Sequence, residues 1–302
     1  MILEVTRHMS VGKVVHRSRR AVLAGLASGL TVACTRVELL AANVPAAFGA
    51  YSLKADISYG TDPQQRLDVY MPDKSAPMPR PLFVFWYGGR WTSGDKSDYR
   101  FVGAALAALS YVAVLPNYRH YPQVKMPGFM DDAAHAVLWA AAHASEFAAD
   151  RQQLYLMGHS AGAHMAALVA LDTRYFKAAG TAVPHIAGVV GLSGAYDFLP
   201  LLDADVKDIF GPPELYPDSQ PINFVSAGAP PMLLVHGAKD GTVAPKNSRN
   251  LASALGARGV RVTLRMYPKL AHADTVAALS IPARRRAPVI ADIAAFVDRR
   301  SY

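Results

Sequence analysis

The fold is decided by the stretch Leu154-Tyr155-Leu156-Met157-Gly158-His159-Ser160-Ala161-Gly162-Ala163-His164. An apolar run ends there in the pattern Gly-X-Ser-X-Gly, and an alanine-rich, helix-forming segment follows at once. This order is typical of a nucleophile elbow, in which a strand turns sharply into a helix and lifts a serine out of the sheet. A Cβ at either glycine would collide with a neighbouring strand or helix. We therefore predict that Ser160 is a nucleophile; a glycine turn that happens to hold a serine is the alternative.

Strand-like and helix-like segments alternate on both sides of this stretch. Period-two patterning on either side of the turn at residues 60–63 predicts an antiparallel hairpin of residues 55–59 and 66–70. Continuous apolar runs predict buried strands at 82–87, 111–115, 153–157, 186–192 and 231–237. An alternating run predicts a last strand at 260–267. Helices are expected at 98–108, 131–149, 161–171, 245–255 and 288–300. The predicted fold class is α/β, with a mostly parallel, doubly wound sheet and an antiparallel N-terminal hairpin.

The composition is that of one globular domain. The chain has 302 residues, of which 52% are hydrophobic and 18% are charged, and this suffices for an α/β domain with a large core. We expect this domain to span residues 51–302. An irregular insertion rich in proline and aromatic residues, around 193–225, suits a lid or a pocket wall, with simple packing as the alternative.

Residues 1–50 have the features of an export signal and a linker. Paired arginines at 19 and 20 precede an apolar run at 21–33, which has the length of a signal-peptide core and is short for a membrane span. We expect export to the periplasm or cell envelope, with a cytoplasmic location as the alternative. Cys34 is the only cysteine, so no intrachain disulfide can form, and residues 31–34 loosely resemble a lipoprotein processing box. Any membrane attachment is expected through this N-terminus only.

The net charge of +8 does not indicate nucleic-acid binding. Residues 1–34 hold five basic residues against one glutamate, so half of the excess lies there. The arginines at 284–286 and 299–300 are typical of a solvated helix face rather than of a phosphate-binding surface. No group of His, Cys, Asp or Glu has metal-ligand spacing, and we predict no metal and no cofactor.

Two further candidate residues follow predicted strands at the same edge of the sheet. Asp240 follows the strand at 231–237 and His272 follows the strand at 260–267. Parallel sheets place catalytic groups at the carboxyl ends of their strands. A serine hydroxyl needs a neighbouring base, and the base needs a carboxylate that fixes its tautomer. The rivals are His236 as base and, as acids, Asp197 and Asp274.

The loop after the strand at 82–87 carries paired glycines, Gly88 and Gly89. Glycines there allow backbone N–H groups to face a cavity, which is how an oxyanion hole is built opposite a nucleophile elbow. A plain strand-to-loop turn is the alternative. Other polar residues are assigned structural roles: Arg119 as a brace for its loop, Asp131 and Asp132 as capping and bracing groups in the first turn of a helix, and His164 and His185 as ordinary polar residues.

Together these motifs resemble the α/β-hydrolase serine carboxylesterases, in the branch of feruloyl-esterase-like and arylformamidase-like enzymes. The motifs are Tyr87-Gly88-Gly89-Arg90-Trp91, Gly158-His159-Ser160-Ala161-Gly162, His236-Gly237-Ala238-Lys239-Asp240 and His272. The similarity runs from about residue 56 to the C-terminus and agrees with the chain order Ser160, Asp240, His272. It implies an α/β-hydrolase fold and backbone donors to the oxyanion from Gly88, Gly89 and Ala161. The motif departs from the family's usual His-Gly-Gly-X-Trp at Tyr87.

We therefore predict a serine carboxylic-ester hydrolase with a Ser-His-Asp triad, an acyl-enzyme intermediate and a small or aromatic ester as substrate. The candidate pocket residues are Tyr87, Trp91, His159, Tyr196 and Phe198. One alternative is an arylformamidase-type amide hydrolase. The other is a non-catalytic binding protein on the same scaffold, against which the complete triad argues.

Overall fold

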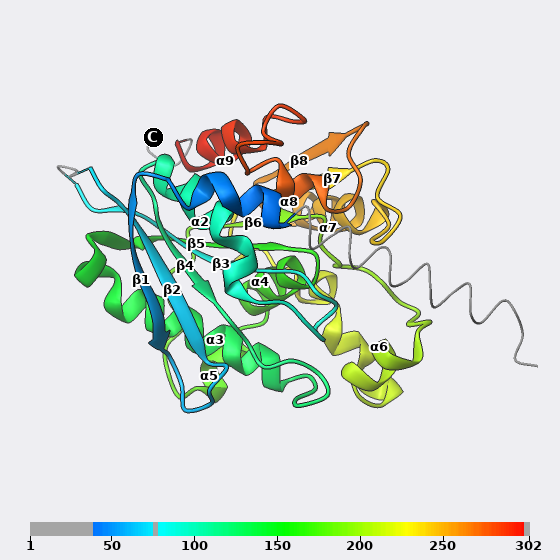
Figure 1. The fold of residues 1–302 in the computed structure, drawn as a ribbon. Helices are drawn as coiled ribbons and strands as arrows, with labels where there is room; N and C mark the ends of the chain where they lie inside the picture. Colours follow the sequence, from blue (N-terminus) through cyan, green and yellow to red (C-terminus); the bar gives the residue numbers. More distant parts are fainter. Residues whose placement is uncertain (1–38, 75–77, 299–302) are drawn as a thin grey trace, which may run out of the picture. The chain divides into compact units, whose positions relative to one another are not determined.

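Eight strands of the described chain, which covers residues 39–74 and 78–298, form one sheet (Figure 1). The structure is a computed structural model. The strands are β1 (Tyr51–Ser58), β2 (Arg66–Pro72), β3 (Arg80–Trp86), β4 (Val112–Pro116), β5 (Ala149–His159), β6 (Gly188–Leu192), β7 (Met232–Gly237) and β8 (Val262–Tyr267). Their order across the sheet is β1-β2-β4-β3-β5-β6-β7-β8.

The sheet is parallel except at its N-terminal edge. β2 pairs antiparallel with both β1 and β4, and each later neighbouring pair is parallel. The predicted hairpin and parallel sheet are thus confirmed. β5 begins four residues earlier than predicted, because Ala149 and Asp150 pair with Arg80 and Pro81 of β3.

Helices cover both faces of the sheet. They are α2 (Arg100–Ala108), α3 (Gly128–His143), α4 (Ala161–Leu171), α5 (Arg174–Ala178), α6 (Ala204–Ile209), α7 (Lys246–Ala257), α8 (Asp274–Ala277) and α9 (Val289–Asp298). Short 3-10 helices are η1 (Lys96–Tyr99), η2 (Ala144–Phe147), η3 (Pro213–Ser219) and η4 (Pro221–Phe224). The helix expected at 131–149 ends at His143, because the chain turns through Ala148, with φ of 53°, to start β5.

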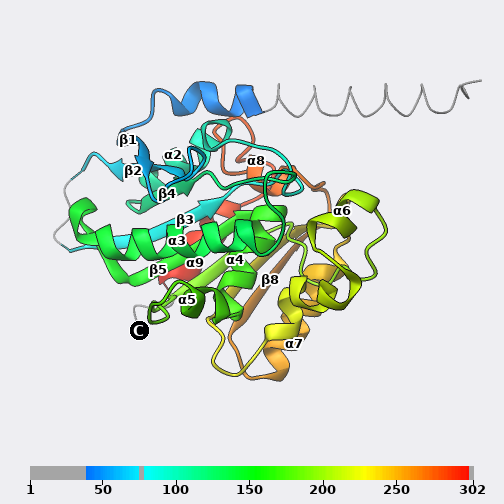
Figure 2. The same ribbon diagram turned by 90° about the horizontal axis from the view of Figure 1, so that it is seen from below.

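Cross-strand register places α2 and α9 on the same face. Tyr70, Phe83 and Tyr155 share that face, since Tyr70 and Phe83 both pair with Ala113 and Phe83 pairs with Tyr155. The ring of Tyr70 packs against Gly103 of α2, and the ring of Phe296 in α9 lies 6.1 Å from that of Tyr155. Figure 2 shows α3 and α4 in front of the sheet, on its other face. Every residue of α4 is buried, so the helix that follows Ser160 lies in the core.

The segment just before β1 is folded onto the core. Residues 39–46 are helical, with Ala42 and Ala46 buried. The Asn43 side chain bonds to the backbone of Ser97, Asp98 and Phe101. The sequence predicts a linker over residues 41–50, and these contacts differ from that expectation. The predicted signal segment up to residue 38, including Cys34, lies outside the described residues.

The insertion at 193–225 holds α6, η3 and η4. It is joined to the loop after β3 by the guanidinium of Arg90, which pairs with Asp203 and Asp205 at 3.1 and 3.0 Å. Lys125 pairs with Asp208 in the same insertion. Within the described ranges, no helix has both the length and the apolar character that a membrane crossing requires.

Candidate active site

Ser160 lies in a strained turn between β5 and α4. Its backbone has φ of 55° and ψ of −120°, a conformation that is costly for a residue with a side chain. A Cβ on Gly158 would lie 2.2 Å from the carbonyl of Gly162, and a Cβ on Gly162 would lie 2.0 Å from the carbonyl oxygen of Trp86 in β3. Both glycines are therefore required for the strand and helix to approach, as the sequence predicts. The Ser160 amide donates to Leu192 O at 2.9 Å and fixes the turn to β6.

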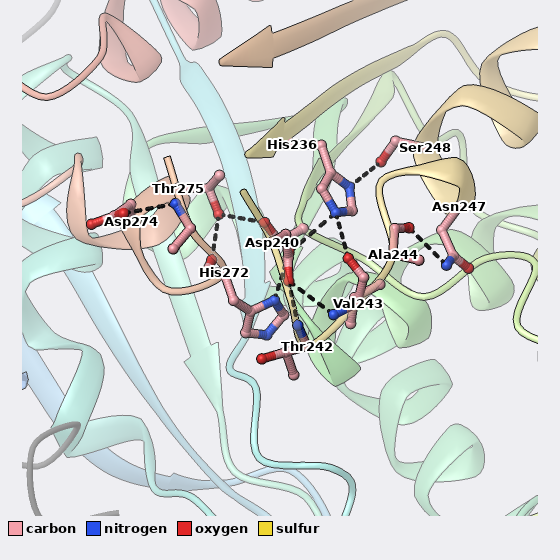
Figure 3. A network of polar contacts seen from close by, with 12 residues as sticks. His236, Asp240, Thr242, Val243, Ala244, Asn247, Ser248, His272, Asp274 and Thr275 are labelled. Carbon is pink, nitrogen blue, oxygen red and sulfur yellow. Dashed lines mark hydrogen bonds and ion pairs between the residues drawn. The ribbon is translucent and has the colours of Figure 1, made fainter. Parts of the chain in front are cut away.

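Asp240 and His272 are hydrogen-bonded (Figure 3). The Nδ1 of His272 lies 2.8 Å from Oδ2 of Asp240, whose side chain is fully buried, whereas the His272 side chain is 18% exposed. The other carboxylate oxygen accepts from the amides of Thr242 and Val243 at 2.9 and 2.8 Å. This contact places the proton on Nδ1 of His272 and leaves Nε2 able to accept a proton.

Hydrogen bonding keeps Asp240 ionised in spite of burial. Burial alone would raise the pKa of its carboxyl, but hydrogen bonds from His236 and His272 outweigh it and hold the pKa well below its usual range. A carboxylate that stays charged can orient an imidazole and stabilise the imidazolium that forms during proton transfer.

His272 lies beside the residue that precedes Ser160. The Nε2 of His159 donates to the carbonyl of His272 at 3.2 Å, and the centroids of the two rings are 4.8 Å apart. Burial, with a smaller contribution from His272, lowers the pKa of His159 to about 3, so this imidazole is neutral. Thr275 donates to the same carbonyl at 3.1 Å and bonds to Ser193 at the end of β6. The loop of His272 is thereby tied to the edge where Ser160 lies.

The rival acids have other partners. Asp197 accepts from Asn250 at 2.6 Å. Asp274 accepts from the Ala271 amide at 2.8 Å and pairs with Arg286. The rival base, His236, contacts the same carboxylate as His272, at 3.1 Å from Oδ2. The sequence offers His236 only as a rival base, and its contact with Asp240 was not predicted, although the spacing of four residues is visible.

The glycine loop after β3 lies against the elbow. A Cβ on Gly88 would be 3.0 Å from the Cβ of Ser160, so the two backbones are neighbours. Gly89 has φ of 137°, and a Cβ there would lie 1.9 Å from Ser93 O. The loop that carries the two expected oxyanion donors, Gly88 and Gly89, therefore adjoins the turn of Ser160.

Of the five expected pocket residues, only Phe198 is partly exposed, and Tyr87, Trp91, His159 and Tyr196 are buried. Tyr87 is 1% exposed, stacks on Tyr118 at 4.9 Å and has its hydroxyl 3.2 Å from Nε2 of His120. Tyr196 is fully buried. A Cβ on Gly191 would lie 1.9 Å from the Tyr196 hydroxyl oxygen, so the hydroxyl occupies the space that this glycine leaves. Tyr87 packs between Tyr99 and Tyr118, and Tyr196 packs against Gly191 and Gly194.

Trp91 and Phe198 join the glycine loop to the insertion. Their rings stack with centroids 6.1 Å apart, and Phe210 of the insertion packs edge-on to Trp91 at 4.8 Å. Trp91 Nε1 donates to Nδ1 of His164 at 3.3 Å, and Nε2 of His164 donates to Ser219 O at 2.8 Å. His164 thus connects the elbow helix, the glycine loop and the insertion. Its position one helical turn after Ser160 was the available sequence signal.

The other polar predictions concern the loop after β4. Arg119 donates from Nε and Nη2 to the carboxylate of Asp132, which is fully buried and also accepts from Gln65 at 2.7 Å. Arg119 therefore braces its loop against α3, as predicted.

No cluster of three or more His, Cys, Asp or Glu side chains suited to a metal ion occurs in residues 39–74 or 78–298.

Comparison with known proteins identifies the family of this site. The BD-FAE family profile matches residues 67–255. "Probable isoprenylcysteine alpha-carbonyl methylesterase ICMEL1" of Arabidopsis thaliana is 29% identical over 74% of the chain, and "Esterase LipC" of Mycobacterium tuberculosis is 31% identical over 68%. The chain spans only 51% and 56% of the lengths of these relatives.

A solved structure shares the whole architecture. The structure of Esterase B from Lactobacillus Rhamnosis has a TM-score of 0.75, with 22% identity over 93% of this chain and 96% of that one. At that identity the likeness shows the fold. The chain has the α/β-hydrolase fold, as predicted.

Proposed function

The chain belongs to the BD-FAE family, and on this premise we propose that it is a carboxylic-ester hydrolase with Ser160 as its nucleophile. The observation that carries the proposal is the 2.8 Å hydrogen bond between Asp240 and His272 beside the strained turn of Ser160. The names of the curated relatives, an isoprenylcysteine methylesterase and an esterase among them, support ester hydrolysis as the reaction.

The reaction would proceed through an acyl-enzyme. His272 Nε2 takes the proton of Ser160 as its oxygen attacks the ester carbonyl, and the buried charge of Asp240 stabilises the resulting imidazolium. His272 then gives this proton to the leaving alcohol. A water molecule, deprotonated by the same imidazole, releases the acid and restores Ser160.

Backbone amides would hold the oxyanion. Ala161 is the first residue of α4, so its N–H belongs to a helix N-terminus, where negative charge is favoured. Gly88 and Gly89 provide the other amides from the loop that adjoins Ser160. Donors of this kind each contribute about 3–4 kcal/mol to transition-state stabilisation.

The substrate would be a small or aromatic ester. The partly exposed ring of Phe198 stacks on the buried ring of Trp91 at the junction of the glycine loop and the insertion at 193–225, which we propose covers the site as a lid. Aromatic surface of this kind favours flat, apolar acyl or alcohol groups.

Replacement of Ser160 by alanine tests the proposal. In folded Ser160→Ala protein, hydrolysis of p-nitrophenyl acetate should fall to background, because no other nucleophile is activated by His272. A variant that unfolds at the wild-type temperature yet hydrolyses the ester at the wild-type rate would refute the assignment.

A further inference from the structure

One buried imidazole near the site has no part in the reaction described above. His236 lies in β7, one position before its end, and is fully buried. Its Nε2 lies 3.1 Å from Oδ2 of Asp240 and 3.0 Å from the carbonyl oxygen of Val243. Its Nδ1 lies 2.7 Å from Oγ of Ser248 in α7 (Figure 3). Two imidazoles, His236 and His272, therefore meet at one carboxylate oxygen.

The contacts of His236 define its tautomer. Both neighbours of Nε2, a carboxylate and a backbone carbonyl, can only accept hydrogen bonds, so Nε2 carries a proton. Ser248 can donate its hydroxyl proton to Nδ1. A neutral imidazole protonated on Nε2 therefore satisfies every partner, with no buried polar atom of this ring left unpaired.

The two oxygens of Asp240 are held in different ways. Oδ1 accepts from two amides of its own loop, Thr242 and Val243. Oδ2 accepts only from side chains among the described contacts, namely from His272 at 2.8 Å and from His236 at 3.1 Å. Without His236, a fully buried anionic oxygen would depend on the partly exposed ring of His272 alone.

We propose that His236 is a positioning residue for ester hydrolysis: its Nε2–H holds Oδ2 of Asp240 in line with His272 and shares the carboxylate charge between two donors. This inference rests on the proposed function, since it assigns His236 to the same site. The competing explanation is that His236 only braces the loop after β7 through Val243 and Ser248.

Charge sharing has a consequence for the pH dependence of the reaction. The titratable groups around the pair are His236, His159 and Asp240, with Lys239 and Asp274 exposed or partly exposed on the two loops. If the donor on His236 is lost, the whole carboxylate charge acts on His272. Protonated His272 is then favoured, and the acid limb of the kcat/KM profile moves to higher pH.

A matched pair of variants separates the two roles. In His236→Gln, the amide nitrogen can take the place of Nε2 and still donate to Asp240. In His236→Asn, the shorter amide reaches toward Ser248 but has no donor at the Nε2 position. We expect His236→Asn to lower kcat by roughly tenfold to a hundredfold, as for the loss of a hydrogen bond to a charged group, with KM little changed and the acid limb shifted upward. His236→Gln should restore most of the lost kcat.

The controls keep the outcomes distinct. Wild-type kcat and pH profile in folded His236→Asn, or an equal loss in both variants with an unmoved acid limb, would overturn the inference. If Ser160→Ala retains activity in the same assay, the proposed function fails; if it is inactive while His236→Asn behaves as wild type, only the role of His236 fails. Nitrogen-15 chemical shifts of wild-type His236 need no variant: a proton on Nδ1 with Nε2 unprotonated overturns the inference, because Nε2 would then have no proton to donate to Asp240.

Discussion

Replacement of Asp240 by asparagine should almost abolish turnover while leaving the fold in place. In the structure, one carboxylate oxygen accepts from the amides of Thr242 and Val243, and the other accepts from the imidazoles of His272 and His236. Asparagine offers one acceptor oxygen and one NH2 group. If its oxygen keeps the two amides, its NH2 group faces two ring N–H donors. The proton of His272 must then move from Nδ1 to Nε2. A protonated Nε2 can no longer accept the proton of Ser160.

The expected magnitude follows from this wrong tautomer. Aspartate-to-asparagine changes in a serine-histidine-aspartate triad lower kcat by about 10⁴-fold, which corresponds to roughly 5 kcal/mol of transition-state stabilisation. The assay is the kcat for p-nitrophenyl acetate at about pH 7, where Asp240 of the wild type is ionised. A thermal melt of the same preparation checks that the variant is folded. A kcat within about tenfold of wild type would refute the assigned role of the carboxylate.

Three further predictions concern stability. Gly158→Ala places a Cβ 2.2 Å from the backbone of Gly162, so we expect a loss of about 3 kcal/mol or more in denaturant unfolding; a loss below about 1 kcal/mol would contradict the close approach of β5 and α4. Burial lowers the pKa of His164 to about 4, so its stabilising contribution is complete above about pH 6.5 and is lost as the pH falls toward 4. His164→Gln should therefore lose about 2 kcal/mol less free energy of unfolding than wild type on acidification from about pH 6.5 to 5, and an equal loss in variant and wild type would exclude this account. Arg90→Gln should change the free energy of unfolding by no more than about 1 kcal/mol, because both of its ion pairs are half exposed, and a larger change would show that they hold the insertion down.

The sheet and the elbow could be predicted because their signals are local. The pattern of Gly158 and Gly162 indicates a nucleophile elbow when a strand precedes it and a helix follows it. The bounds of α4, residues 161–171, agree with the prediction, since the strained Ser160 and the extended Asp172 delimit the helix. Burial on both faces makes β3 and β6 continuous apolar runs, which the sequence displays directly.

The second partner of Asp240 could not be predicted in the same way. His236 lies four residues before Asp240, but only the turn after β7 folds its ring back onto the carboxylate. From sequence alone it was a rival base. The burial of Tyr196 has no local sequence signal either, because its ring fills space that Gly191 and Gly194 leave open.

The contacts around residues 39–50 show a different limit. An alanine- and proline-rich composition favours a linker, yet Asn43 accepts from the first turn of α2 and donates to η1. The side chain of Asn43 thus anchors residues 39–50 at the start of α2, although the composition of this segment predicts no packing onto the domain.

Covalent labelling of Ser160 tests the central claim most directly. Purified protein is treated with a fluorophosphonate probe, digested, and mapped by peptide mass spectrometry. The account predicts a single adduct on the peptide that contains Ser160, formed far more slowly in Asp240→Asn because His272 no longer activates the serine. An adduct on another residue, or no adduct in folded protein that hydrolyses esters, would contradict it.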